Sequence, residues 1–400
     1  MSMLAQVGFG KKTLVQDALR LHSITGAVLS ARSERMDAIE PFMSSVRQVE
    51  NQSILLFDPQ CYMQTMPDVD LGHIDEYPFF LPSLQADSLL APRQIMDWVK
   101  LTVDYQLGLP VTHVLSPTMF VTNLSSQPFF TSLSLAAETL AYLQERGEDS
   151  SRVLISLCLS HHAVTDTKNL NLLLNRVTGM PAGAAAGFYL VIDVDPDEHE
   201  PYMGSHSLAA LLRICYGLGK LNERVVHVAF TGYLGLLLQA VGAASTSAGW
   251  FTKERRFSHK DYMPRTASRQ PNERYSSSKL MTSILVSPNL LNYVQLLGPE
   301  EILTDTRSAT LQPIVSGKIA PWSARTDCSH FWGDMTERLA LLEQHDSVAD
   351  RLSVVESWLH EARTRWGKIR SAGYPVIAGE PKHIDNMLAA AQEFRNENDV

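Results

Sequence analysis

The chain has 400 residues, of which 45% are hydrophobic and 19% are charged, and its formal net charge is −9. This composition provides enough apolar side chains for a large core and excludes an intrinsically disordered protein. The acidic balance argues against nonspecific coating of nucleic acid, which depends on basic surface. The length predicts one barrel of roughly 250 residues with a smaller appended part.

Residues 1–25 are expected to form a helical segment ahead of the main domain. Their short apolar run is followed by Lys11 and Lys12, a pattern that does not predict a secretory signal. The most apolar stretch, residues 225–252, contains polar side chains such as His227. It is better explained by buried strands and a helix than by a membrane span. The four cysteines are widely spread, which favours a reducing compartment and a cytoplasmic location.

Seven short apolar runs recur along the chain, and each ends in small or polar residues. They cover residues 26–30, 53–58, 111–117, 153–160, 187–193, 225–231 and 243–249. Continuous apolar runs of this kind are typical of parallel strands that are buried on both faces. Segments between them, such as residues 132–146 and 207–219, have the pattern of amphipathic helices. With an eighth candidate strand at 281–287, the sequence predicts an α/β fold, a parallel (β/α)8 barrel of the TIM type.

The predicted barrel covers residues 26–325, and a C-terminal helical extension covers residues 326–400. The polar, turn-rich stretch 251–279 is expected to form a long loop over the carboxyl ends of the strands. An open, doubly wound sheet is the alternative architecture. It lacks its usual support, because no G-x-G-x-x-G motif follows a strand and opens a helix.

Carboxylates stand at the ends of two predicted strands. Asp58 ends one strand, and Asp193 ends another, with Asp195 two residues later. Active sites of parallel barrels lie at the carboxyl ends of the strands, so these three are the candidate catalytic residues, as base, nucleophile or hydrogen-bond acceptor. A helix cap explains Asp58 equally well. A solvated acidic loop is the competing explanation for Asp193 and Asp195.

Other polar or small residues near the strand ends are candidates for binding a substrate. They are Gln60, His161, Thr231, Gly232, Gly249 and Trp250. His161 and its neighbour His162 could supply an acid, a base or a metal ligand. Neighbouring histidines in such loops often have no chemical role, and this simpler explanation stands beside the catalytic one.

Basic residues gather between positions 253 and 279, where eight of them stand against three acidic residues. The candidates for binding a nucleic-acid backbone are Lys253, Arg255, Arg256, Lys260 and Arg265. Neighbouring aromatic side chains, Trp250 among them, offer faces for base stacking. The alternative is a solvated loop that happens to be basic.

Metal-binding patterns are weak in this sequence. Cys328, His330, His345 and His360 have suitable side chains, but a second cysteine at finger-like spacing is missing. The sequence therefore predicts no bound metal, and no motif calls for another cofactor.

Several segments together resemble the tRNA-guanine transglycosylase family, whose members are (β/α) barrels. Residues 187–189, Gly187 to Tyr189, look like the family's glycine-led strand, and residues 235–242 look like the element after the following strand. Arg255 and Arg256 resemble the basic end of that region. The run 53–62 looks like the strand whose aspartate contacts the base, which implies that role for Asp58 and substrate contacts for Gly187 and Tyr189.

The sequence departs from this family in two places. Residues 245–250 contain no carboxylate where the family carries its nucleophile, and only Cys328 and His345 remain of its zinc site. The resemblance thus implies a divergent branch, such as one that modifies DNA with deazaguanine bases, that has either relocated its nucleophile or lost base exchange. The candidates for a relocated nucleophile are Asp193, Asp195 and Asp58.

Three functions remain open at this point. The first is base exchange on tRNA or DNA, with a purine or deazaguanine-type base bound near Asp58 and nucleic acid bound by residues 253–279. The second is a non-catalytic nucleic-acid-binding or scaffold subunit of a protein complex. The third is an unrelated barrel enzyme for a small phosphorylated substrate, in which Gly232 and Gly249 would cradle the phosphate.

Overall fold

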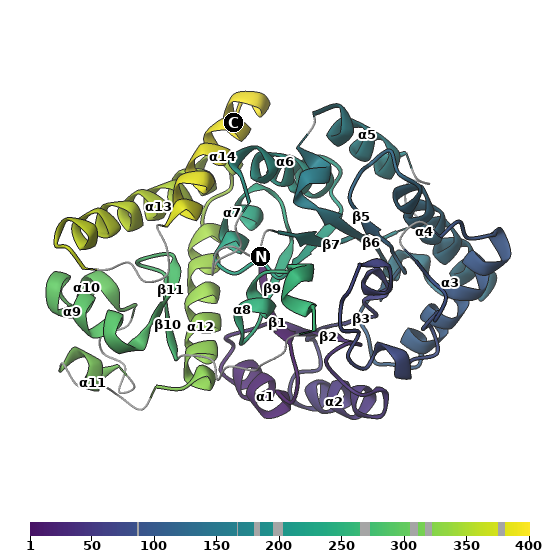
Figure 1. Ribbon diagram of the computed structural model, residues 1–400, viewed down its shortest axis with the longest axis horizontal. Helices are drawn as coiled ribbons and strands as arrows, with labels where there is room; N and C mark the ends of the chain where they lie inside the picture. The colour runs from purple at the N-terminus through teal and green to yellow at the C-terminus, as the bar shows by residue number, and fades with distance from the viewer. Residues whose placement is uncertain are drawn as a thin grey trace.

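A computed structural model of the protein describes residues 1–85, 88–165, 167–179, 185–194, 203–264, 273–304, 311–316, 322–374 and 381–400. It confirms the predicted fold class. Eight strand positions form a nearly closed parallel barrel with helices between the strands, and a mainly helical region follows (Figure 1).

The barrel strands are almost entirely buried. They are β1 (Ser2–Val7), β2 (Gly26–Ser30), β3 (Ile54–Asp58), β4 (Val114–Leu115), β5 (Phe120–Val121), β6 (Val153–Ser160), β7 (Gly187–Asp193), β8 (Val225–Ala229) and β9 (Ser245–Ala248). Their order is β3-β2-β1-β9-β8-β7-β6-β4, all parallel, and β5 also pairs with β6. Thr112 bridges β3 and β4, because its backbone N–H donates to the Leu55 carbonyl at 2.8 Å. That contact brings the two ends of the sheet together.

Helices surround the barrel, and their apolar faces pack against it (Figure 1). They are α1 (Lys12–Arg20), α2 (Met36–Val49), α3 (Pro92–Leu107), α4 (Gln127–Glu145), α5 (Thr167–Thr178), α6 (Ser205–Cys215) and α7 (Leu234–Val241). Residues 132–146 and 207–219, expected to be helical, lie largely within α4 and α6.

The N-terminal segment differs from its prediction. Residues 1–25 contain the first barrel strand, β1, as well as helix α1, and β1 pairs with β2 on one side and with β9 on the other. The barrel therefore begins at Ser2 and not at residue 26. Gln6 interrupts the apolar run of β1, yet its side chain is buried, so the sequence pattern did not look like that of a buried strand.

The eighth predicted strand is also placed differently. β11 (Thr282–Leu285) pairs in antiparallel fashion with β10 (Arg274–Ser277), in a two-stranded sheet separate from the barrel. The prediction of a barrel strand at 281–287 was thus wrong. A short apolar run fits a strand of a hairpin as well as a strand of a barrel, and only the strand that it pairs with distinguishes the two.

The last barrel strand, β9, ends at Ala248, so the mainly helical region after the barrel begins well before the predicted residue 326. It contains α9 (Leu291–Leu297), α10 (Pro299–Ile302), α11 (Gln312–Val315), α12 (Ala324–Glu343), α13 (Val348–Ser371) and α14 (Lys382–Asn398). Helix α12 runs between the barrel and the β10–β11 sheet (Figure 1) and packs against β1, α7 and β10. Ser323 caps its N-terminus by accepting from the Thr326 N–H.

After β9, the chain crosses the carboxyl ends of the strands. This crossing segment contains α8 (Thr252–Arg255) and the short 3-10 helix η6 (His259–Tyr262). Arg255 fixes its start. The guanidinium donates to the Gly249 carbonyl at 2.9 Å, to Ser283 Oγ at 2.9 Å and to Asp327 Oδ2 at 2.9 Å. Arg255 therefore joins the barrel to the β10–β11 sheet and to α12.

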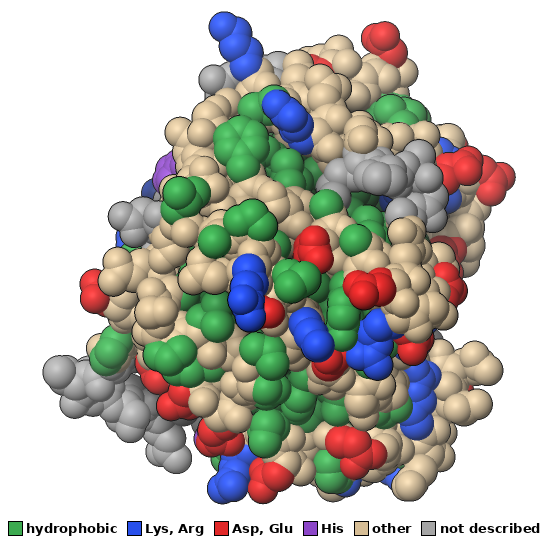
Figure 2. Space-filling view, turned by 90° about the vertical axis from the view of Figure 1, so that its right-hand side faces the viewer, with side chains coloured by type: hydrophobic (Ala, Val, Ile, Leu, Met, Phe, Trp, Pro, Cys, Tyr) green, Lys and Arg blue, Asp and Glu red, His purple; other side chains and the backbone are tan. Residues whose placement is uncertain are grey.

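The outer surface has a mixed character. On the side that carries α3 and α4, positive, negative and apolar side chains lie interspersed (Figure 2). On α3, for example, Arg93 pairs with Asp97 while Leu101 is exposed. Among the helices that the structure describes, none is long and apolar enough to cross a membrane.

Removal of the Arg255 charge is expected to weaken the fold strongly. The Arg255→Met variant leaves Asp327 buried without its cation, and such a loss typically costs about 3–5 kcal/mol. The matched control is Arg325→Met, because the Arg325–Asp17 pair is about half exposed and pairs of that kind contribute less than about 1 kcal/mol. Urea denaturation followed by circular dichroism measures both. Equal losses in the two variants would contradict a central role for Arg255.

Candidate functional site

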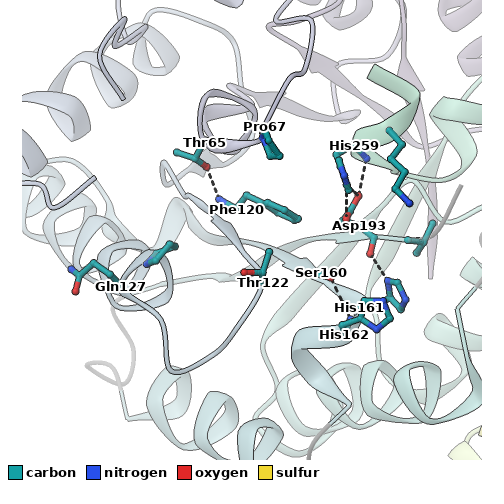
Figure 3. A pocket seen from close by; sticks show the side chains of 13 residues that line it. Thr65, Pro67, Phe120, Thr122, Gln127, Ser160, His161, His162, Asp193 and His259 are labelled. Atoms are coloured by element: carbon teal, nitrogen blue, oxygen red, sulfur yellow. Dashed lines mark hydrogen bonds and ion pairs between the residues drawn. The ribbon is translucent and has the colours of Figure 1, made fainter. Parts of the chain in front are cut away.

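A cavity of about 730 Å³ opens at the carboxyl ends of β5, β6 and β7 (Figure 3). Its walls come from the segments after β3, β5, β6, β7 and β9 and from the start of α4. The lining residues are Thr65, Pro67, Phe120, Thr122, Gln127, Pro128, Ser160, His161, His162, Asp193, Val194, His259 and Lys260. Such a volume suits a small organic ligand, and the position matches the end of the barrel where chemistry is expected.

Asp193 and His259 form a close pair in this cavity. The Asp193 carboxylate accepts a hydrogen bond from the His259 backbone N–H at 2.7 Å. Nδ1 of the same histidine lies 2.9 Å from Oδ2 and 3.0 Å from Oδ1. The Asp193 side chain is only 7% exposed, whereas that of His259 is 24% exposed. The histidine is therefore the partner that a ligand can reach more easily.

The contacts with Asp193 orient the His259 ring. When the carboxylate is ionised it can only accept, so Nδ1 then carries the hydrogen and Nε2 is the ring atom that can exchange a proton with a ligand. Burial raises the pKa of Asp193, while the hydrogen bonds and the charge of His259 lower it. A carboxylate that orients an imidazole in this way is a common arrangement for general acid–base catalysis.

A second imidazole is oriented by the same residue. His161 Nδ1 lies 3.0 Å from the backbone carbonyl oxygen of Asp193, and the rings of His161 and His162 are 3.8 Å apart between centroids. Figure 3 shows this pair and His259 around Asp193. His161, His162 and Asp193 were all recognised in the sequence at strand ends, and the structure brings them into one cavity.

An apolar wall faces these polar groups. The ring of Phe120 lies 6.0 Å from that of His259 between centroids. The backbone N–H of Phe120 donates to Thr65 Oγ1 at 2.9 Å, which ties β5 to the loop after β3. Lys260 is exposed and adds a positive charge to the lining. The cavity therefore offers a flat apolar surface beside groups that can transfer protons or bind an anion.

Asp58 lies outside the lining of this cavity, in the barrel interior. Its Oδ2 accepts from the hydroxyls of Tyr62 and Tyr189, each at 2.9 Å, and its Oδ1 accepts from the Gln60 N–H at 2.9 Å. Burial raises the pKa of Asp58 to about 6, despite these three hydrogen bonds. The contacts link β3 to β7 across the barrel, so the structure favours a structural role over contact with a base.

The buried Asp58 carboxyl is expected to make stability depend on pH. Its pKa rises from 3.8 in its ordinary environment to about 6 in the fold, so the folded state favours the protonated form. Below about pH 4 this preference contributes about 3 kcal/mol to the free energy of unfolding, and the contribution is lost as the pH rises through 6. Asp58→Asn, which keeps the shape without the charge, should remove that dependence.

Urea denaturation at several pH values between 4 and 7 measures this difference. The exposed carboxylate of Asp97 provides the control, since Asp97→Asn should keep the pH slope of the parent protein. A parallel slope in Asp58→Asn and the parent would show that Asp58 does not titrate in this range.

The remaining substrate-binding candidates lie outside the cavity lining. Gln60 is buried and accepts from the Arg32 N–H, and Tyr189 is engaged with Asp58. Gly187 begins β7 at the opposite end of the barrel, where a Cβ would lie 1.8 Å from the Val225 carbonyl oxygen. Packing of adjacent strands explains this glycine.

The loops after β8 and β9 hold the other candidates. Thr231 is buried, and its N–H donates to the Ser247 carbonyl at 3.0 Å. Gly232 adopts a left-handed conformation with φ of +52°, which favours glycine. Gly249 accepts from Arg255, and Trp250 is half-buried next to Lys11.

The basic loop is mostly an internal element. Arg255 and Arg256 are each 6% exposed, and Arg256 pairs with Asp261 at 3.1 Å. Both guanidinium groups are therefore largely inaccessible in this conformation, which the sequence could not show because it reveals charge but not burial, and their binding to a nucleic-acid backbone stays a prediction. Lys253 is half-buried, with its ammonium over the Tyr262 ring. Lys260 lines the cavity, while Arg265 and the catalytic candidate Asp195 lie outside the described residues.

Metal ligands do not gather in the described part of the chain, where no group of three or more His, Cys, Asp or Glu side chains could hold an ion. Cys328 is buried within α12, and burial raises the pKa of its thiol. His330, two residues along α12, stacks on the ring of Tyr275 with centroids 5.0 Å apart. The absence of bound zinc stays a prediction for elemental analysis.

Sequence reasoning missed His259 and Phe120 as functional residues. His259 lies in a polar loop 66 positions beyond Asp193, and no spacing rule connects the two. Phe120 belongs to a strand of two residues, which is too short for a periodic pattern. The one available signal for His259 was its place in the loop expected to cover the strand ends.

Comparison of the chain with protein-family models and with curated protein sequences gave no match. Arguments about function therefore depend on the geometry of the cavity.

Proposed function

We propose that the protein is a barrel enzyme that performs general acid–base chemistry on a small ligand bound in the cavity at the ends of β5, β6 and β7. The observation that carries this proposal is the Asp193–His259 pair, with Nδ1 held by the buried carboxylate. His259 is the proton-transfer group, and Asp193 orients it and stabilises its protonated form.

The other lining residues support a ligand with two different parts. Phe120 offers an aromatic face of the kind that packs against a planar ring. Lys260, together with the imidazoles of His161 and His162, suits a polar or anionic group. The substrate class that fits is a small cyclic molecule with an acidic or strongly polar substituent.

Replacement of either member of the pair should abolish turnover while preserving the fold. His259→Gln lacks the imidazole that transfers the proton, and Asp193→Asn no longer stabilises an imidazolium, so we expect a loss of about 100-fold or more. Because the substrate is unidentified, purified protein is incubated with a mixture of small metabolites, and consumed compounds are detected by mass spectrometry.

The matched control is His206→Gln. His206 Nδ1 pairs with Glu393 at 2.8 Å, a similar contact on the outer surface, so this variant should consume the same compounds as the parent protein. The proposal fails if His259→Gln and the parent protein give the same consumption profile.

Base exchange on nucleic acid, which the sequence resemblance implies, is the narrower candidate. It is favoured by one observation: Asp193, a candidate nucleophile, lines the cavity. Both of its oxygens contact His259, so attack on a sugar carbon would require this contact to open. Arg255 and Arg256 are buried and do not line the cavity. Among its described lining residues, Lys260 is the one with a Lys or Arg side chain.

Exchange of labelled guanine into tRNA or DNA tests this candidate directly. The candidate predicts incorporation by the parent protein and none by Asp193→Asn. Binding of tRNA or DNA without any incorporation would support the non-catalytic alternative, a recognition or scaffold subunit with protein partners. Lack of both binding and incorporation would remove nucleic acid from the proposal and leave the small-molecule enzyme.

A further inference from the structure

A second polar site lies at the ends of β1 and β9, away from the cavity. There the carboxylate of Glu254, a residue of α8, points into the protein. Its Oε2 accepts from the backbone N–H groups of Trp250 at 2.7 Å and Phe251 at 3.2 Å. Its Oε1 lies 3.9 Å from the ammonium of Lys11. Glu254 is 5% exposed and Lys11 is 9% exposed, so an anion is held here in a buried setting.

Two glycines allow the backbone to approach this carboxylate. A Cβ on Gly8 would lie 1.6 Å from Glu254 Oε1, and a Cβ on Gly249 would lie 2.7 Å from Oε2. Neither position could accept a larger residue without moving the carboxylate. The loops after β1 and β9 are therefore shaped closely around a small group that carries oxygen atoms. We call Gly8, Lys11, Gly249, Trp250 and Phe251 the cradle.

Two side-chain donors of the cradle make no hydrogen bond, although Lys11 also has its ion pair with Glu254 at 3.9 Å. Lys11 Nζ and Trp250 Nε1 are both buried, and neither has a hydrogen-bond partner among the described residues. The ammonium lies 4.7 Å from the centroid of the Trp250 ring and 4.6 Å from that of Phe251, which provides attraction but no acceptor atom. Buried donors without acceptors are rare in native proteins and call for an explanation, such as an absent ion.

A tetrahedral oxyanion would satisfy this donor set better than a carboxylate. It carries more acceptor oxygens than the two of Glu254, and backbone N–H groups together with a lysine are common ligands of phosphate in proteins. A groove of about 390 Å³ runs beside the cradle and is lined by Gly10, Lys11, Lys12 and Glu34 among others. An anion could enter from this side.

We propose that the cradle is a binding site for a phosphate group, either inorganic phosphate or that of a small phosphate ester, and that the Glu254 carboxylate occupies it in the present conformation. The ligand must displace Glu254, so the side chain acts as an internal competitor. This site does not depend on the acid–base function proposed for the cavity.

The experiment removes the internal competitor. Glu254→Ala opens the cradle, and its melting temperature should rise by a few degrees, in a saturable way, as inorganic phosphate is added. Sodium chloride at equal ionic strength should not reproduce the shift. The double variant Glu254→Ala with Lys11→Met should lose the shift. Glu393→Ala, which removes a carboxylate on the outer surface, is the matched control and should not gain a phosphate response.

Comparison of inorganic phosphate with adenosine 5′-monophosphate, and of the latter with adenosine, distinguishes a free phosphate from an ester. A saturable shift with either phosphate compound supports the proposal. The proposal is overturned if folded Glu254→Ala shows no phosphate-specific shift, or if the shift persists without Lys11. If Glu254→Ala is obtained unfolded, refolding decides the matter: recovery in phosphate but not in sodium chloride supports the site, and no recovery in phosphate overturns it.

Discussion

A guanidinium buried between the barrel and the helical region is the interaction on which the candidate site depends. Burying a charged group is costly unless hydrogen bonds and an opposite charge surround it, and Arg255 finds them on three separate elements. Phe331 of α12 covers its face, with the ring centroid 4.3 Å from the guanidinium carbon. The segment after α8 therefore starts from a fixed point. From there Phe257 accepts from the Val194 N–H at 2.9 Å, and His259 reaches Asp193.

The interior of the barrel is polar for a protein core, and this polarity is organised. His227 lies between Ser245 at 2.8 Å and Ser247 at 3.2 Å, and Ser247 donates to Gln6 at 2.8 Å. The His227 ring stacks on Tyr189, with centroids 5.3 Å apart, and Tyr189 donates to Asp58. Burial lowers the pKa of His227 to about 3. Hydrogen bonds of this kind between strands hold them in register where apolar packing alone would be less specific.

The sequence was sufficient for the fold class because the barrel strands are continuous apolar runs, as parallel strands buried on both faces must be. It was insufficient where an inward-facing polar residue broke the pattern, as Gln6 did in β1. Asp193 and His161 could be predicted as site residues since strand ends are local features. His259 could not, because only the folded chain brings it to Asp193. The burial of Arg255 and Arg256 could not be predicted for a related reason: charge is visible in a sequence, but burial is not.

The pairing of β1 has a consequence for how the protein is made. Ser2 lies opposite Ser245, and Leu4 lies opposite both Gly26 and Ser247. One edge of β1 thus stays without its partner until β9 has been synthesised. Contacts between such distant parts of a chain slow folding, and an open strand edge invites association with other chains.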